Sequence, residues 1–162
     1  KRYDAVTFKC VEADDVVALL HEQDREGSII CSVDKDLLQI PGQHYNIQHK
    51  KRIEIDPNEA YYLWCKQLLM GDNVDNIPGI PRCGEKTATA ILEKADDYYA
   101  AVIEAWTLAL AKDNLPEHLQ DRTVESVLEE LEMLITIGGE RAQEEINKSA
   151  EAKSYRSLSE QV

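Results

Sequence analysis

The sequence predicts an α/β fold whose strands lie in a parallel sheet, and two features of its first third carry this prediction. Apolar residues recur at helical spacing over residues 13–27, and residues 28–33 form a continuous apolar run of strand length. Such a run is typical of a strand that is covered on both faces, as in a parallel sheet. With the β-prone residues 5–11 before them, these segments predict a βαβ unit.

The composition is that of a folded, acidic protein. Of the 162 residues, 43% are hydrophobic and 30% are charged, which excludes disorder throughout and suits one domain with or without a helical appendage. The net charge of −13 argues against a general nucleic-acid binder, which is basic. No apolar run approaches the ~20 residues of a membrane span, and the first residues do not resemble a signal peptide. The four cysteines are widely spaced, which favours reduced thiols in the cytosol over disulfides or a zinc site.

Local signals define the middle of the chain. Residues 41–50 are polar and turn-rich, and residues 53–55 are expected to form a short strand. Asp56 suits a helix cap and Pro57 suits the first helical position. The helix that begins there carries an apolar stripe and is expected to end near Gly71.

The rest of the chain is predicted to be helical, with turns between the helices. Proline and glycine break residues 71–84, a new helix is expected from Gly84, and two amphipathic helices are expected over residues 99–111 and 123–136. The two tryptophans lie on apolar helical stripes, so both are expected in the core and not on a base-stacking surface.

Three groups of acidic residues stand at the ends of predicted elements. Each has an ordinary explanation: compensation of a helix dipole, a helix cap, and a turn. Together they favour a metal site, because crowded carboxylates are costly unless neutralised and because ligands of α/β proteins bind beyond the carboxyl ends of strands. Carboxylate oxygens with few histidines nearby suit Mg²⁺ or Mn²⁺, and two such ions ~3.5–4 Å apart can cleave a phosphodiester bond. The groups are Glu12, Asp14 and Asp15; Asp34 and Asp36; and Asp72 and Asp75.

A tight turn that leads into a helix lies beside the third acidic group. Residues 77–84 hold two prolines and two glycines, and backbone N–H groups at the start of the following helix can bind an anion. Arg82 and Lys86 add positive charge, while Gly79 and Gly84 let the backbone approach a ligand closely. An ordinary corner between two helices explains the same residues, so the composition alone leaves both interpretations open.

Four motifs combine these acids with the turn. They are Val11-Glu12-Ala13-Asp14-Asp15-Val16, Ser32-Val33-Asp34-Lys35-Asp36-Leu37-Leu38-Gln39, Met70-Gly71-Asp72-Asn73-Val74-Asp75-Asn76-Ile77-Pro78-Gly79 and Gly84-Glu85-Lys86-Thr87-Ala88. In order and spacing they resemble the motifs of the 5′-nuclease family, which includes flap endonucleases, phage 5′-exonucleases and the 5′-nuclease domain of bacterial DNA polymerases. The resemblance covers about residues 5–95.

The resemblance implies a fold and a division of the chain. The fold is the second half of a PIN-like parallel-sheet domain, followed by a helix–three-turn–helix and a helical C-terminal region. Residues 1–55 would form the partial α/β metal-binding part, residues 56–112 the helix–three-turn–helix region, and residues 113–162 the helical C-terminal region.

The resemblance also implies an activity: structure-specific 5′-3′ hydrolysis of DNA that has a 5′ end, a nick or a flap, with two Mg²⁺ or Mn²⁺ ions. All seven acids would bind metal, and the catalytic ones would be Glu12, Asp14, Asp34 and Asp36. The turn would grip the backbone of the duplex, with a K⁺ held by loop carbonyls. The residues implied in DNA contact are Gly79, Arg82, Gly84, Glu85, Lys86 and Thr87.

The chain departs from the family pattern in two ways. Family members usually carry glycine where Val33 stands and Gly-Ile or similar where Arg82-Cys83 stand. They also have an earlier half, with further metal-binding aspartates and a basic arch, that nothing here matches. We therefore expect a second polypeptide, a dimer partner or a longer chain to supply that half, in the cytoplasm of a bacterial or phage-infected cell. A non-catalytic DNA-binding module and a metal-dependent RNase are the alternatives.

Overall fold

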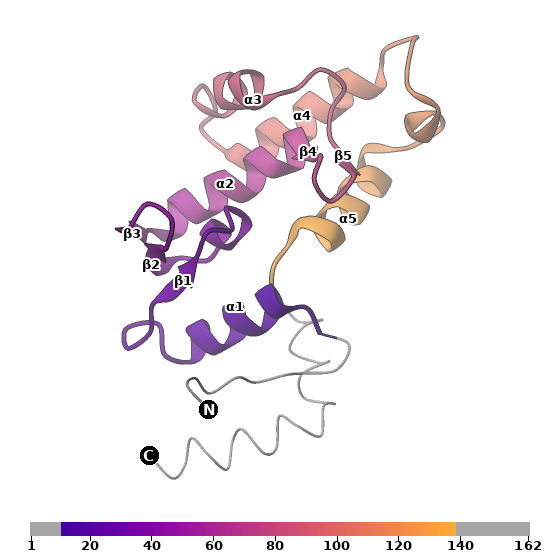
Figure 1. Ribbon diagram of the computed structural model, residues 1–162. Coiled ribbons are helices and arrows are strands. Elements are labelled where there is room, and N and C mark those ends of the chain that lie inside the picture. The colour runs from indigo at the N-terminus through magenta and orange to yellow at the C-terminus, as the bar shows by residue number, and fades with distance from the viewer. Residues whose placement is uncertain (1–10, 139–162) are drawn as a thin grey trace. The chain divides into compact units, whose positions relative to one another are not determined.

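The computed structural model describes residues 11–138 (Figure 1). The chain forms two compact units, the first comprising Lys1–Ile55 with Ile137–Val162 and the second comprising Asp56–Thr136. The strand expected over residues 5–11 lies outside the described residues except for its last residue, as does the C-terminal region beyond residue 138. The division of the later helices at residue 112 stays a prediction.

The first unit contains a helix and a small mixed sheet. Its elements are α1 (Ala13–Gln23), β1 (Ile30–Ser32), a 3₁₀ helix (Asp36–Gln39), β2 (Gly42–Asn46) and β3 (Lys51–Ile55). The strand order is β1-β2-β3, in which β1 and β2 are parallel while β2 and β3 are antiparallel. Side chains from α1, β1, the 3₁₀ helix and the residue that follows it form its core, namely Ala18, Ile30, Leu37 and Ile40 with Val17 and Ile137 against them.

Two expectations for this unit are wrong. Residues 42–46 form a strand and not a polar loop, because hydrogen bonds to a neighbour on each side hold a segment that has no apolar alternation of its own. The turn is confined to residues 47–50. The strand β1 is not covered on both faces, since Ile30 is buried whereas Cys31 is exposed.

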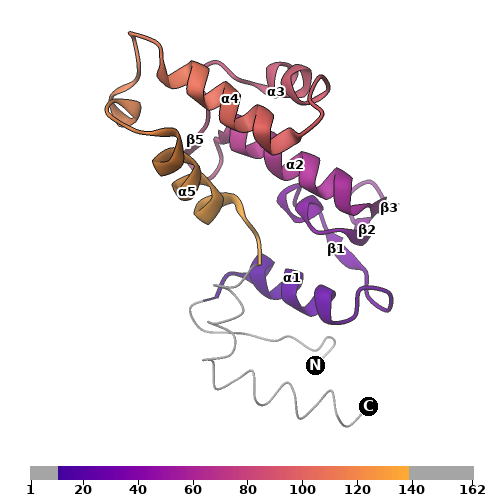
Figure 2. The same cartoon turned by 180° about the vertical axis from the view of Figure 1, so that it is seen from behind.

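The second unit is helical, as expected. Its elements are α2 (Pro57–Met70), β4 (Gly71–Asp72), β5 (Ile77–Pro78), α3 (Glu85–Leu92), α4 (Tyr98–Leu110), a 3₁₀ helix (Glu117–Leu119) and α5 (Val124–Ile135). The predicted cap is confirmed, because the Asp56 carboxylate accepts the backbone N–H groups of Asn58 and Glu59 at 2.8 and 2.9 Å. The helix α2 contacts α3, α4 and α5, and Figure 2 shows α4 lying along it.

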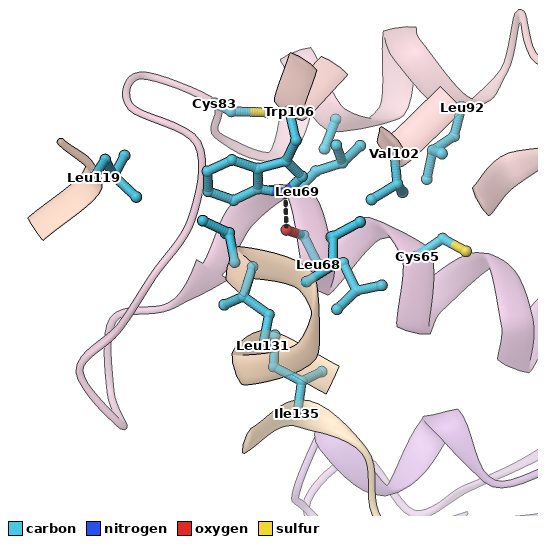
Figure 3. Packing of buried hydrophobic residues seen from close by; sticks show 13 residues of the cluster. Cys65, Leu68, Leu69, Cys83, Leu92, Val102, Trp106, Leu119, Leu131 and Ile135 are labelled. Atoms are coloured by element: carbon cyan, nitrogen blue, oxygen red, sulfur yellow. Dashed lines mark hydrogen bonds between the residues drawn. The ribbon is translucent and has the colours of Figure 1, made fainter. Parts of the chain in front are cut away.

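The core of the second unit is built around Trp106. This side chain is fully buried, and its indole N–H donates to the carbonyl oxygen of Leu68 at 3.1 Å (Figure 3). Trp64 is only half-buried: its ring stacks on Tyr99 with 5.8 Å between ring centroids, and its indole N–H donates to the Thr136 hydroxyl at 3.0 Å. The expected core position is thus confirmed for Trp106, while Trp64 packs at the edge of the same cluster.

A phenol–carboxylate hydrogen bond joins α4 to α5 and predicts a pH dependence. The Tyr99 hydroxyl donates to the Glu132 carboxylate, and this bond together with burial raises the pKa of Tyr99 to about 12. Because the phenol titrates at ~10 in the unfolded chain, its stabilising contribution is complete below pH ~10 and is lost as the pH rises toward ~12. Absorbance titration should therefore show a late tyrosine step that Tyr99→Phe removes. Tyr62→Phe should retain that step, and its loss in this control would contradict the assignment.

None of the helices between residues 11 and 138 is long and apolar enough to cross a membrane.

Candidate functional site

The first acidic group gathers at the start of α1. Glu12 occupies the N-cap position, and Asp14 and Asp15 lie in the first helical turn. One carboxylate oxygen from each of these three residues lies within 4.8 Å of the others. The helix dipole favours negative charge here, but three carboxylates this close also repel one another, which a cation would relieve. Their oxygen atoms are the donors that Mg²⁺ and Mn²⁺ prefer.

The second acidic group follows β1. The Asp34 carboxylate accepts the backbone N–H of Asp36 at 3.0 Å, and the backbone N–H of Asp34 donates to the Ser32 hydroxyl at 2.9 Å. These bonds turn the chain sharply from the strand into the 3₁₀ helix, so that both acids stand at the carboxyl end of β1. Asp34 is exposed and Asp36 is half-buried.

A cavity of about 630 Å³ between α1 and β1 links these two groups. Asp14 and Asp34 both line it, as do His21 and Asp24. The structure thus brings residues from the first and second motifs to the walls of one cavity in the first unit. Burial lowers the pKa of His21, whose ring nitrogen Nδ1 lies 2.6 Å from the Ser28 hydroxyl oxygen. A mainly neutral histidine that is hydrogen-bonded to a serine fits a structural role.

The third acidic group lies in the second unit, with Asp72 at the end of β4 and Asp75 in the turn between β4 and β5. Asp72 is buried, and its carboxylate accepts the backbone N–H of Val74 at 2.8 Å and the Gln67 amide at 3.3 Å. Asp75 is exposed, and one of its carboxylate oxygens lies within 4.8 Å of one from Asp72. A buried aspartate beside a second carboxylate is more than a turn requires, although turn chemistry accounts for the bond to Val74.

The turn from β5 into α3 carries the residues expected to contact DNA. Gly79 packs directly on the end of α2, where the backbone N–H of Ile80 donates to the Leu69 carbonyl at 2.9 Å. Arg82 is exposed and has a left-handed backbone with φ of 65°, which is uncommon for a residue other than glycine. A left-handed backbone favours glycine, so this conformation agrees with the glycine that the family resemblance leads us to expect here, and Arg82 adopts it at some conformational cost.

The start of α3 is open to solvent. Gly84 is the N-cap, and its carbonyl accepts the backbone N–H groups of Thr87 and Ala88 at 2.9 and 3.0 Å. Glu85 and Lys86 are exposed in the first turn. Lys66 forms an ion pair with the Glu85 carboxylate, which offsets the repulsion that this carboxylate would exert on a phosphate. Lys66 was not among the residues expected at this site, because it lies one helix earlier in the sequence.

Asp15 has a second contact that its motif does not reveal. Its carboxylate accepts the backbone N–H of Gly138 at 2.7 Å, across 123 positions of sequence, and Asp15 is only 9% exposed. Gly138 has φ of +78°, and Ile137 beside it packs on the core of the first unit. The carboxylate therefore fastens the returning chain to α1.

Two substitutions of Asp15 distinguish the role of its carboxylate as a hydrogen-bond acceptor from the effect of its negative charge. Asp15→Ala is expected to cost about 1 kcal/mol and to speed hydrogen exchange at the Gly138 amide roughly tenfold, since the N–H loses its partner. Asp15→Asn keeps an acceptor oxygen and should preserve most of the protection. Amide exchange measured by NMR decides the matter, and equal exchange in the two variants would contradict the contact.

The comparison with known families decides the relationship. Residues 63–152 match the family described as 5′-3′ exonuclease, C-terminal SAM fold. The chain belongs to this family. The 5′-3′ exonuclease of Buchnera aphidicola from Acyrthosiphon pisum is 39% identical over 101 residues, which are 55% of this chain and 35% of the relative. DNA polymerase I of Bacillus caldotenax is 35% identical over 109 residues, or 57% of this chain and 12% of the polymerase.

Solved exonuclease structures share the fold. The T5 D15 protein co-crystallised with metal ions superimposes with a TM-score of 0.60 at 18% identity, over 82% of this chain and 53% of that one. A mutant T5 5′-exonuclease gives a TM-score of 0.58 at 17% identity, over 82% of this chain and 58% of that one. These matches confirm the predicted fold class. This exonuclease-family chain spans about a third of the Buchnera relative and about half of the T5 structures.

Proposed function

We propose that this chain carries metal-binding and duplex-binding parts of a structure-specific 5′-3′ nuclease that acts on DNA in the cytoplasm. The observation that carries the proposal is the cavity of the first unit, where Asp14 and Asp34 line the same walls and Glu12 and Asp15 stand beside Asp14. Membership of the 5′-3′ exonuclease family makes phosphodiester hydrolysis the chemistry that such an acidic cavity would serve.

The proposed roles follow from the donor atoms. Glu12, Asp14, Asp15, Asp34 and Asp36 would hold hard divalent cations of the Mg²⁺ or Mn²⁺ type, and Asp72 with Asp75 are further proposed ligands. Two such ions, when bound, supply the activation of water and the stabilisation of the leaving oxygen. The carboxylates would act on the scissile phosphate only by holding the cations in position. Converting any one of them to an amide removes its negative charge and should therefore weaken cation binding.

The β5–α3 turn is the proposed grip on the duplex. The backbone N–H groups of Gly84 and Glu85, with the Lys86 ammonium, would bind phosphate oxygens, and Arg82 would add a further cationic contact. Gly79 and Thr87 belong to the same surface, and a K⁺ held by loop carbonyls would strengthen it. Phosphate contacts position a duplex without reading its sequence, which suits recognition of a 5′ end, a nick or a flap. Residues beyond this chain, on the same or a second polypeptide, are proposed to complete the nuclease.

Metal-dependent melting tests the proposal directly. Millimolar Mg²⁺ or Mn²⁺ should raise the Tm by several degrees, because a ligand that binds only the folded state stabilises it by mass action. Asp14→Asn and Asp34→Asn should each remove most of this rise. Glu26→Gln changes an exposed carboxylate of the same unit outside the cavity and should keep it. A Tm of the parent protein that does not change when divalent ions are added would refute the metal site.

Cleavage and binding assays then separate catalysis from binding alone. When the residues that complete the nuclease are supplied, on the same or a second polypeptide, release of a 5′ label from a flap or a nicked duplex, dependent on Mg²⁺ and lost in Asp34→Asn, is the expected result. Duplex binding that needs no divalent ion, with no cleavage under any condition, would instead support the non-catalytic DNA-binding module.

A further inference from the structure

A groove in the second unit lies beside the proposed DNA surface but has a different character. It encloses about 540 Å³, within the range of ligand pockets, between the turn at residues 80–83, α3 and α4. Its apolar walls include Ile80, Ile91 and Leu108, and alanines on α4 leave the space between them open. Leu108 is 63% exposed at the rim, so this apolar surface is available to a partner.

The charge around the groove is opposite to that of the chain. Arg82, Lys94 and Lys112 line it and are exposed, whereas Glu104 is the one acidic residue among the lining residues that the structure describes. The whole chain has a net charge of −13, so a cationic border is a local feature that attracts an anionic ligand.

Two anionic partners are conceivable, and the apolar walls distinguish between them. A nucleic-acid backbone would satisfy the three cations but would leave Ile80, Ile91 and Leu108 in contact with water or charged phosphate. An amphipathic helix would satisfy both features, with apolar side chains at positions i, i+3, i+4 and i+7 in the groove and carboxylates on its flanks against the cations.

We propose that the groove between α3 and α4 binds an acidic amphipathic helix of a partner protein. Arg82 and Thr87 line the groove and also belong to the proposed duplex surface. Because these two residues are shared, the partner helix and the duplex would compete for them. This part of the inference rests on the proposed function. A protein bound in the groove would then regulate access of DNA to the β5–α3 turn.

The experiment uses the full chain and a designed probe. The probe is a fluorescein-labelled peptide of about 15 residues with leucine at i, i+3, i+4 and i+7 and glutamate or alanine elsewhere, and its control is a scrambled peptide of the same composition. Fluorescence anisotropy should show roughly tenfold tighter binding of the designed peptide. Leu108→Asp, and separately Lys94→Glu with Lys112→Glu, should each weaken that binding roughly tenfold.

A matched variant on the same helix controls for general effects of the substitution. Ile103 is 41% exposed on α4 but lies outside the groove, so Ile103→Asp should leave peptide binding unchanged. Circular dichroism confirms that each variant is folded. Equal binding of designed and scrambled peptides, or equal effects of Leu108→Asp and Ile103→Asp, would overturn the proposal.

Duplex DNA provides the last two outcomes. If Leu108→Asp weakens duplex binding as much as peptide binding, the groove is a nucleic-acid surface and the helix proposal is wrong. If the designed peptide binds as predicted but does not displace a flap duplex, helix docking is supported, and the placement of DNA on Arg82 and Thr87 fails instead. The two proposals can therefore fail separately.

Discussion

Replacing Trp106 with alanine is expected to lower the free energy of unfolding of the second unit by about 3–5 kcal/mol. The side chain is fully buried among residues of α2, α3, α4 and α5, including Leu68, Leu92 and Leu131 (Figure 3). Its removal leaves a cavity around which a packed core closes only in part, and it leaves the Leu68 carbonyl without the indole N–H.

Urea unfolding followed by circular dichroism measures this loss of unfolding free energy, and two further variants serve as comparisons. Trp106→Phe keeps most of the aromatic volume and should cost less, chiefly through the missing donor at Leu68. Leu134 is 49% exposed on α5, so Leu134→Ala should change stability by about 0.5 kcal/mol or less. A loss below ~1 kcal/mol in Trp106→Ala would mean that the packing around this ring is not as described.

Gly79→Ala is expected to disrupt the β5–α3 turn, at a cost at or above the upper end of the ~1–3 kcal/mol usual for overpacking. A Cβ atom on Gly79 would lie 2.1 Å from the Met70 carbonyl carbon and 2.4 Å from the Gly71 nitrogen. Both obstacles are backbone atoms, which cannot rotate away as a side chain does. The effect is reciprocal, because a Cβ on Gly71 would lie 2.3 Å from the Gly79 nitrogen.

Gly84 supplies the control for this substitution. It has an extended backbone with φ of −97°, and no atom lies within 4 Å of the position that its Cβ would take. Serine is also a favourable N-cap residue, so Gly84→Ser should unfold at the same urea concentration as the parent or slightly above it. Equal midpoints for Gly79→Ala and the parent would show that the turn can widen without loss.

The elements that could be predicted are those with signals in their own residues. The limits of α2 follow from Asp56 and Pro57 at one end and Gly71 at the other, and the structure has them there. The strand β2 could not be predicted, because Gly42–Asn46 becomes a strand through pairing with β1 and β3 and not through its own pattern.

The features of the candidate site likewise divide into those that local sequence predicts and those that depend on the folded structure. The grouping of Glu12, Asp14 and Asp15 is local to one helix start and was therefore visible in the sequence. The shared cavity of Asp14 and Asp34 was expected from their places at element ends, but its extent and its other walls depend on packing. The burial of Asp72 and the bond between Asp15 and Gly138 depend on residues that approach only in the folded chain.

The second unit is an insertion within the first, since the chain leaves the first unit after Ile55 and re-enters it at Ile137. When the inserted unit unfolds, Ile55 and Ile137 become the ends of a long flexible loop, and holding those ends on one folded body costs loop-closure entropy. Folding of the inserted unit removes most of that cost. A mutation that weakens the inserted unit should therefore also loosen the contact of Asp15 with Gly138, so damage in the second unit reaches the first through chain connectivity alone.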